Sequence, residues 1–437
     1  MPTTQVSRST LRASLAAAWL AAAVPASLFG AAAPAPSTDW PQLRGPRGDG
    51  ASEGHGLLAS WAGGGPKELW RRPIGEGFSS VAVRGDRLFT MSLDGEQETV
   101  LCLRLEDGEL VWKAPIGPKF TEEFGNGPRS TPAVDDERVY ALSASGRLAA
   151  LRASDGAEVW ERDLVAELGG RLPLRGYSPS PVVDEGLLLL EVGGAEGKSI
   201  VAFDPATGSP KWTALDQRPG YSTPIVVSID GVKQYVFAHT AGADVVALRP
   251  DGSVHWKFNW PNGPIAMPVF VPPNRIFVST ANDVGSALLE VGRAADGTAA
   301  VKQVWASREM KNHFNTTVFH QGHLYGFDNA TFKALDAATG KTKWAHRGFG
   351  KGSVLLADGL LLVLSDRGVL ALVEASPEGY RELGRVQAMN GKSWTSPAIA
   401  GGRIILRDQD EIVAYDLRVA AAVADSPGTG TGTGAAQ

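Results

Sequence analysis

The chain contains a single cysteine, Cys102, among its 437 residues. One cysteine cannot form a disulfide within the chain. Cys102 also lies in the strand-like run Thr99–Leu105, far from the N-terminus, so we expect no lipid-attachment cysteine at the start of the mature protein.

The sequence also lacks an excess of charge of one sign. It has 42 Lys and Arg against 47 Asp and Glu, a net charge of −5, and no long run of either sign. Because phosphate binding needs a concentrated basic face, we expect no nucleic-acid partner. Beyond the N-terminal segment no apolar run is long enough to cross a bilayer, so we expect no membrane span.

The first residues have the order of a secretory signal. Arg8 and Arg12 precede the apolar run Leu15–Phe29, and the small residues Gly30–Ala33 follow it. Pro25 interrupts the run, which favours a cleaved signal peptide over a membrane helix. We therefore expect residues 1–33 to be removed and the mature protein to be periplasmic or secreted, as a monomer.

Motifs for common catalytic sites are missing. No Gly-x-Ser-x-Gly nucleophile elbow occurs, and the Gly-rich stretch at Gly193–Ser199 lacks the first glycine and the following helix of a phosphate loop. His320 and His323 flank a turn, not one face of a helix, so we assign no metal site there. No residue is predicted to be catalytic.

What the sequence does contain is a tryptophan repeat. Seven of the twelve tryptophans recur at intervals of 39 to 52 residues, and five of the seven stand four residues after a glycine in an Asp-Gly or Thr-Gly pair; the seven are Trp70, Trp112, Trp160, Trp212, Trp256, Trp305 and Trp344. Repeats of this length are typical of four-stranded propeller blades. A regularly repeated buried aromatic is typical of a core, so we expect these tryptophans to be structural.

Each repeat also carries three earlier strand signals. A Ser/Thr-Pro motif opens several repeats, as in Ser130–Val134 and Ser222–Val226, and proline is tolerated at the first residue of a strand. An Asp or Gly turn and a second apolar strand follow. The third strand has a pattern such as Leu148–Leu151, and its Asp-Gly or Thr-Gly turn leads to the tryptophan strand.

Counting these signals predicts a closed ring of eight blades. Eight first strands occur, but the last repeat ends near Leu417 without a fourth strand, while Glu68–Arg71 is a tryptophan strand with no repeat before it. The fold class is therefore all-β: an eight-bladed β-propeller of four-stranded antiparallel blades, closed by the N-terminal strand completing the last blade. Such closure removes two exposed sheet edges.

The repeat resembles that of pyrroloquinoline quinone (PQQ)-type propellers. The resemblance rests on Ala334–Trp344 and its weaker copies and covers roughly residues 67–417, and the opening Trp40–Pro46 is similar to the start of exported PQQ-binding-like β-propeller repeat proteins. The resemblance implies a girdle of tryptophans between blades. It does not imply one function, because members of the superfamily include both enzymes and binding proteins.

The family includes both dehydrogenases and noncatalytic binding proteins. Its dehydrogenases hold PQQ against a disulfide of adjacent cysteines, and some carry a Cys-x-x-Cys-His haem site; this chain has neither. They also hold Ca²⁺ through acidic and amide side chains. The oxygen ligands available here are Glu122, Glu123, Asn126, Asn315 and Asp408, which no motif connects. A noncatalytic relative is the propeller lipoprotein of the outer-membrane β-barrel assembly machinery, although this chain has no lipidated cysteine.

The residues three positions before the first-strand proline, or its equivalent, are expected to ring one mouth of the central channel. With their neighbours they form an aromatic funnel with cationic points: Phe78, Arg129, Tyr177, Tyr221, Phe314, Asn315, Lys351 and Trp394. Such a funnel could stack a planar ligand or anchor a peptide, with Arg129 pairing a carboxylate. The alternative is that these side chains only fill the channel mouth.

The sequence thus predicts four parts: a signal peptide at 1–33, a loop segment at 34–66 that packs on the propeller, the propeller at 67–419, and a disordered Gly/Thr/Ala tail at 420–437. The predicted function is noncatalytic binding of a protein partner or small ligand at the channel mouth. The alternative is a PQQ- and calcium-dependent dehydrogenase of alcohols or sugars.

Overall fold

The computed structural model describes residues 39–418 apart from 55, 58, 62–63, 240–243, 262, 264 and 282, together with Met1. The described strands all lie in one compact unit. The expected signal peptide at 1–33 and tail at 420–437 lie outside the described residues, Met1 apart. Among the residues described, no helix is long and apolar enough to span a membrane.

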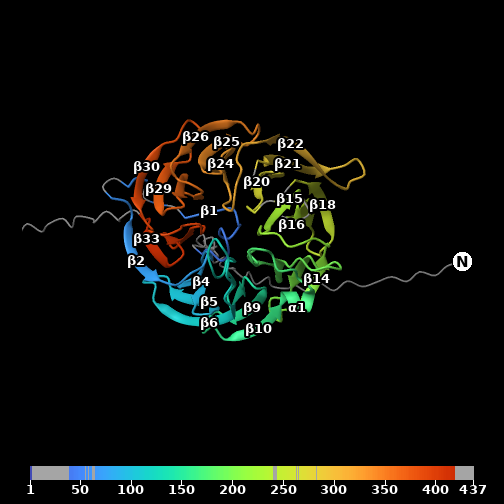
Figure 1. The fold of residues 1–437 in the computed structure, drawn as a ribbon. Helices are drawn as coiled ribbons and strands as arrows, with labels where there is room; N and C mark the ends of the chain where they lie inside the picture. The colour runs from blue at the N-terminus through green and yellow to red at the C-terminus, as the bar shows by residue number, and fades with distance from the viewer. Residues whose placement is uncertain are drawn as a thin grey trace, which may run out of the picture. The chain divides into compact units, whose positions relative to one another are not determined.

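Eight antiparallel blades surround a central channel, as the sequence predicts (Figure 1). Blades 1 to 4 are β3 (Ala82–Arg84), β4 (Arg87–Asp94), β5 (Gln97–Arg104) and β6 (Leu110–Pro118); β7 (Ala133–Val134), β8 (Arg138–Leu142), β9 (Arg147–Arg152) and β10 (Glu158–Asp163); β11 (Val182–Asp184), β12 (Leu187–Glu191), β13 (Ile200–Phe203) and β14 (Pro210–Ala214); and β15 (Ile225–Ile229), β16 (Val232–Ala238), β17 (Asp244–Leu248) and β18 (Val254–Asn259).

The second half of the ring repeats this order. Blades 5 to 8 are β19 (Val269–Val271), β20 (Arg275–Thr280), β21 (Gly285–Arg293) and β22 (Ala299–Ser307); β23 (Val318–His320), β24 (His323–Asp328), β25 (Thr331–Asp336) and β26 (Thr342–Arg347); β27 (Ser353–Ala357), β28 (Leu360–Leu364), β29 (Val369–Glu374) and β30 (Glu382–Gln387); and β31 (Ala398–Ala400), β32 (Arg403–Arg407), β33 (Glu411–Asp416) and β2 (Lys67–Pro73).

The N-terminal strand closes the ring. β2 pairs antiparallel with β33, so that Trp70 lies opposite Ala414, as Trp160 lies opposite Ala150 in blade 2. The guanidinium of Arg71 donates to Glu411 at 2.7 Å and to the backbone carbonyl oxygen of Ala388 at 2.9 Å. The predicted closure by residues near Trp70 is therefore confirmed.

The tryptophan girdle joins consecutive blades. In six of the seven cases the indole N–H donates to a backbone carbonyl in the turn between the third and fourth strands of the next blade: Trp70 to Leu105, Trp112 to Ala153, Trp160 to Pro205, Trp212 to Pro250, Trp305 to Ala337 and Trp344 to Ser376. Trp256 instead donates to the Gln234 side chain of its own blade. The apolar cores lie between blades, as where β4 and β5 pack on β8 and β9.

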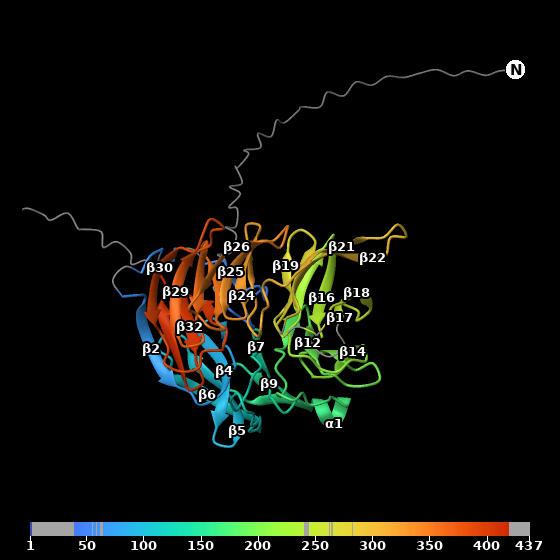
Figure 2. The same cartoon turned by 45° about the horizontal axis from the view of Figure 1, so that its top comes forward.

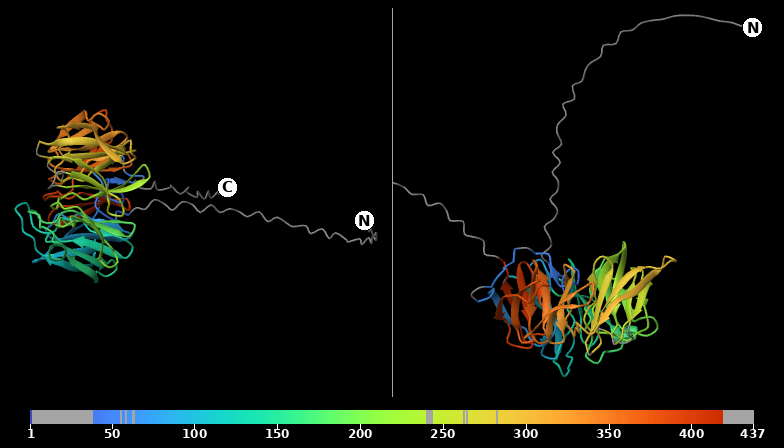
Figure 3. Two further views of the ribbon diagram at one scale, coloured as in Figure 1. Left: turned by 90° about the vertical axis from the view of Figure 1, so that its right-hand side faces the viewer. Right: turned by 90° about the horizontal axis from the view of Figure 1, so that it is seen from above.

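The segment before β2 lies across the channel at the end opposite the β4–β5 hairpin and α1 (Leu164–Leu168). Trp40 forms a backbone bridge with Val83 of blade 1, and the Val134 N–H of blade 2 donates to Pro41 at 2.8 Å. The segment then adds β1 (Ala51–Ser52) parallel to β27 of blade 7. Figure 2 shows the β4–β5 hairpin and α1 projecting from one end of the ring and the β21–β22 hairpin from the other, and Figure 3 shows the ring from two further sides.

Candidate functional site

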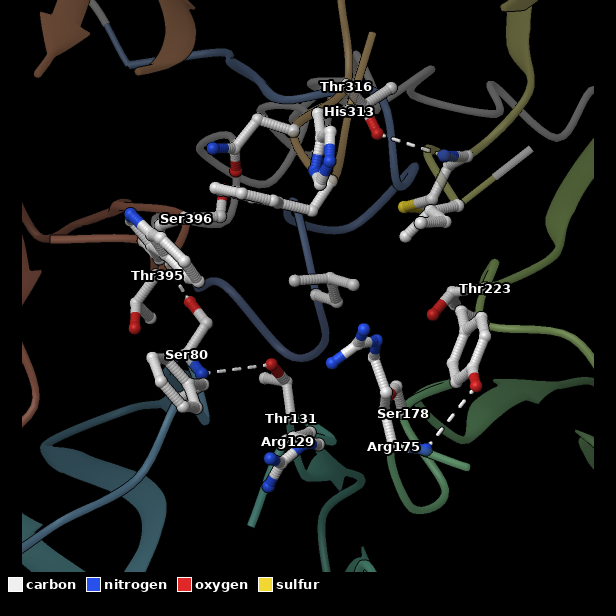
Figure 4. Close-up of a pocket in the computed structure, with 18 of the residues that line it drawn as sticks. Ser80, Arg129, Thr131, Arg175, Ser178, Thr223, His313, Thr316, Thr395 and Ser396 are labelled. Carbon is white, nitrogen blue, oxygen red and sulfur yellow. Dashed lines mark hydrogen bonds between the residues drawn. The ribbon is translucent and has the colours of Figure 1, made fainter. Parts of the chain in front are cut away.

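A cavity of about 440 Å³ occupies the channel at the end where each blade receives its first strand. Seven of the eight residues of the predicted funnel line it: Phe78, Arg129, Tyr221, Phe314, Asn315, Lys351 and Trp394. Figure 4 shows side chains from different blades converging on this cavity, with the dark-blue N-terminal segment crossing behind them. The volume lies in the range of ligand pockets.

Tyr177 is the exception. It is fully buried between blades 2 and 3, where its hydroxyl donates to the Val192 carbonyl at 2.8 Å. Its neighbour Ser178 lines the cavity instead. In an extended segment successive side chains point in opposite directions, so only one of the two can face the channel.

One wall of the cavity is aromatic. The Trp394 ring lies 5.0 Å from Phe314, 6.0 Å from Phe78 and 6.1 Å from Phe124, measured between ring centroids. These rings come from three different blades and from the connection between β6 and β7. Together they present a broad apolar surface to whatever enters the channel.

Arg129, predicted to pair the carboxylate of a ligand, already has a carboxylate partner within the chain. Its guanidinium donates to the Gly125 carbonyl at 2.8 Å and lies 3.4 Å from Glu122, and both of these ionic side chains are about 9% exposed. Glu122 is also paired with Arg175. Arg129 therefore holds the β6–β7 connection in place, and burial lowers its pKa.

Two other basic groups that line the cavity, Lys351 and His313, have fewer polar partners than Arg129. Lys351 forms no ion pair with any residue that the structure describes, and the adjacent Asp366 carboxylate accepts the Lys351 backbone N–H at 3.0 Å. His313 lines the same cavity, and its pKa is lowered by burial and by the charges of Lys351 and Arg175. A histidine with a lowered pKa is neutral at pH 7.

The floor of the cavity comes from the N-terminal segment. Leu43 and Arg44 line it from below. Arg44 is almost fully buried and donates over long distances, 3.2 to 3.4 Å, to the backbone carbonyls of Asp49, Thr317 and Val354. Burial lowers the pKa of Arg44 to about 10, although nearby Asp49 opposes this effect.

A row of Ser and Thr side chains joins blades 1 to 4 along the channel. The backbone N–H of Ser80 donates to Thr131 Oγ1 at 3.1 Å, that of Thr131 to Ser180 Oγ at 2.9 Å, and that of Ser180 to Thr223 Oγ1 at 2.8 Å. Each bond joins one blade to the next. The Ser or Thr of the Ser/Thr-Pro motif therefore links blades, a role that the pattern of prolines alone does not indicate.

Two further features could not be found from the repeat. The sequence indicated that the Trp40 segment packs on the propeller, but nothing in it showed that Arg44 reaches the channel. Likewise, Glu122, Phe124 and Arg175 lie in connections between blades, outside the repeated motif. Only the unusual length of these connections, residues 119–132 and 164–181, could have drawn attention to them.

The residues present do not fit a calcium–quinone site. Of the five oxygen ligands considered from sequence, Glu122 and Glu123 pair with Arg175, Asn126 donates to Glu76, Asn315 donates to the Gly352 carbonyl, and Asp408 accepts the Gly391 N–H. No group of three or more acidic, His or Cys side chains suited to a metal occurs among the described residues. Cys102, the single cysteine, is buried in blade 1.

Comparison with known proteins gives sequence relatives of one kind. The outer membrane protein assembly factor BamB of Moranella endobia is 24% identical over 289 residues, which cover 63% of this chain and 72% of the relative. BamB of Xanthomonas campestris is 32% identical over 105 residues, 24% of each chain.

Solved structures share the fold. BamB from Moraxella catarrhalis aligns with a TM-score of 0.59 and 14% identity, covering 82% of this chain and 99% of that one. Quinohemoprotein alcohol dehydrogenase from Comamonas testosteroni aligns with a TM-score of 0.61 and 13% identity, covering 89% and 82%. At such identities the likeness concerns the fold alone.

A comparison with models of protein families also gives a match. The family model described as outer membrane protein assembly factor BamB matches residues 96–346, more than half of the chain. The protein therefore belongs to this family of PQQ-repeat β-propellers.

Proposed function

We propose that this protein is a noncatalytic binding module of the bacterial cell envelope, which holds a protein partner against the funnel end of its ring. The observation that carries the proposal is an exposed apolar rim directly beside the aromatic funnel. Relatives that share the family are named as outer membrane protein assembly factors, which supports a role in assembling or holding other proteins.

The rim is formed by two connections between blades. Leu174 is 84% exposed, Leu172 49% and Phe124 42%, and all three lie in the connections 119–132 and 164–181. The Arg175 guanidinium lies 4.3 Å from the centroid of the Phe124 ring and joins the two connections. Exposed apolar side chains grouped in this way are typical of a protein-interaction site.

The funnel adds the kind of residue that dominates binding energy in interfaces. Trp, Tyr and Arg are enriched among the residues that contribute most to binding energy, and Trp394, Tyr221 and Arg175 all line the cavity. A partner that covers the rim and inserts one side chain into the funnel would desolvate these groups.

Export to the periplasm belongs to the same proposal. It rests on the expected signal peptide and agrees with the names of the relatives, which refer to the outer membrane.

Partner capture from the native host tests the proposal. We expect Tyr221→Ala combined with Trp394→Ala, and separately Leu172→Ser combined with Leu174→Ser, to reduce recovery of the partner that the wild type retains by about tenfold or more, equivalent to about 1.4 kcal/mol or more. The measurement is quantitative mass spectrometry of proteins retained by the purified, tagged chain.

The matched control is Val254→Ser combined with Val304→Ser. These two valines are also exposed but lie on the outer strands β18 and β22, away from the funnel. Thermal unfolding should be nearly unchanged in the rim and control variants. If the control variant lost the partner as strongly as the funnel and rim variants, the funnel end would not be the contact surface.

A further inference from the structure

We propose that the inner funnel binds a carboxylate carried on an extended peptide segment of the partner. This inference rests on the proposed function and names the chemistry that the cavity would recognise. It assigns the carboxylate to the region between Lys351, Arg175 and the hydroxyl groups of Thr395 and Ser396.

The charge of the cavity favours an anion. Four basic side chains and one carboxylate line it, a net charge of +3, in a chain whose net charge is −5; the basic residues are Arg44, Arg129, Arg175 and Lys351, and the carboxylate is Glu122. Basic residues gathered in a concave, partly desolvated space create a strong local potential. The basic groups inside the funnel therefore exceed what Glu122 can neutralise.

Lys351 is the basic group of the cavity that most clearly lacks a counter-ion among the described residues. Arg129 and Arg175 share Glu122, and Arg175 also reaches Glu123. Lys351 has no such partner within the described part of the chain. An ammonium group without a counter-ion at the edge of an apolar cavity is stabilised when a carboxylate binds beside it.

Unpaired polar atoms give a second, independent indication. Thr395 and Ser396 line the cavity, and their hydroxyl oxygens are buried without a hydrogen-bond partner among the described residues; Thr395 is 3% exposed. Buried hydroxyls are normally satisfied. A carboxylate can accept a hydrogen bond from whichever of these two successive side chains faces the cavity while it pairs with a cation.

His313 lies within the field of the same cations. Its Nδ1 is buried without a partner, and the positive charges that lower its pKa are those of Lys351 and Arg175. An anion bound between these groups would offset their charge and raise the pKa of His313. His313 therefore serves as a reporter of anion binding that does not depend on any activity.

The shape of the site favours a peptide over a free small carboxylate. The cavity opens beside the exposed rim, and Arg175, which lines the cavity, directly follows Leu174, the most exposed large hydrophobic side chain among the described residues between 39 and 418. A peptide can place an acidic side chain inside and lay apolar side chains on the rim. A free small carboxylate would leave the rim uncovered.

Histidine NMR on the intact protein tests this inference. The chain has seven histidines, and the signal of His313 is identified by its loss in His313→Gln. The probe is the capped peptide acetyl-Leu-Asp-Phe-Asp-Leu-amide, compared with its Asn counterpart and with sodium acetate at equal carboxylate concentration. We expect the acidic peptide to raise the pKa of His313 by about half a unit or more, and the other two probes to leave it nearly unchanged.

Two variants separate a specific site from general electrostatics. In Lys351→Gln, about ten times more acidic peptide should be needed to produce the same rise in the pKa of His313 above the value that the variant has without peptide. Lys343→Gln, the same charge change on the exposed outer strand β26, should need no more peptide than the wild type. An equal effect of the Asn peptide or of acetate, or an unchanged response in Lys351→Gln, would overturn the inference. If the rim variants still lost the partner in that case, the proposed function would be supported although the carboxylate site was not.

Discussion

At the scale of single residues, five of the girdle tryptophans pack directly on a turn glycine of the next blade. The Trp112 indole lies so close to the turn of blade 2 that a Cβ built on Gly156 would be 2.5 Å from the ring. Gly156 also has a φ of +75°, a conformation that other residues adopt at a cost of about 1 kcal/mol or more. The glycine that stands four residues before five of the tryptophans therefore meets two requirements, a positive φ and close contact with the preceding tryptophan, and the sequence indicated only the first.

We predict that Gly156→Ala destabilises the protein far more than Gly186→Ala. Gly186 has nearly the same φ, +76°, but open space around the position of a Cβ. Gly186→Ala should lower the free energy of unfolding by about 1 kcal/mol. Gly156→Ala should lower it by a further amount of about 1 to 3 kcal/mol, because the added methyl group overpacks the contact with Trp112. Urea denaturation measures both, and equal losses would show that the contact with Trp112 does not constrain the turn.

Glu98 gives a prediction about pH. Its side chain is 0% exposed, one oxygen accepts the Ala144 N–H at 2.8 Å and the other has no partner among the described residues. Burial raises the pKa of Glu98 to about 7, above the usual 4.5. Between those two values the unfolded chain has released the proton and the folded chain retains it, so stability falls as the pH rises.

We therefore expect Glu98→Gln to remove a decline in unfolding free energy between about pH 4.5 and pH 7, worth no more than about 3 kcal/mol. Glu96→Gln, in the same hairpin but exposed, should keep the decline. Chemical denaturation at several pH values, compared as differences from the wild type, measures the effect. A Glu98→Gln curve parallel to that of the wild type would contradict it.

The limits of sequence prediction are clearest at this scale. The spacing of the repeat placed Phe78, Phe314 and Trp394 on the channel, because equivalent positions in equivalent blades share one environment. It failed for Tyr177, since the choice between two neighbouring residues depends on which one faces the channel. It placed Arg129 on the channel as well, but it did not indicate the partners of Arg129, which lie in a connection without any repeated pattern.

At the scale of elements, closure of the ring depends on β2. This strand supplies the fourth strand of blade 8 and also Trp70, which docks on the turn of blade 1. Closure was predictable because the count of strands left one incomplete repeat at each end of the chain. The path of the preceding segment was not, because Trp40 to Ser52 contacts blades 1, 2 and 7 through backbone groups that no sequence pattern marks.

A truncation tests closure. We expect a chain that begins at residue 75 to expose the edge of β33 and to form aggregates or exchanged oligomers, because unpaired edges recruit other strands. A chain that begins at residue 39 retains β2 and should stay monomeric. Size-exclusion chromatography with light scattering separates the outcomes, and a stable monomer from residue 75 onward would show that β2 is dispensable.

At the scale of the whole molecule, the propeller was predictable and its use was not. Eight blades follow from the repeat, whereas the same ring occurs in a BamB and in an alcohol dehydrogenase. The choice rests on side chains in the connections and in the channel. Glu122, Asn126 and Asp408 are held by cations, side chains and backbone groups instead of converging on a metal.

We therefore predict that PQQ with Ca²⁺ does not reconstitute a dehydrogenase. At micromolar PQQ and millimolar Ca²⁺ the purified protein should show neither saturable quinone absorbance nor alcohol- or sugar-dependent dye reduction. The physical reason is the missing donor set and the absence of a second cysteine beside Cys102. Saturable binding with turnover would replace the proposed function by the enzymatic one.

The central claim is that the funnel end of the ring holds a protein partner, and site-specific photo-crosslinking in cells of the native host tests it most directly. A photoreactive residue at position 174 or 221 should give a discrete crosslinked product containing one other envelope protein, while the same residue at position 254 or 343 on the outer strands should not. Crosslinks of equal yield from all four positions, or only from the outer strands, would contradict the account.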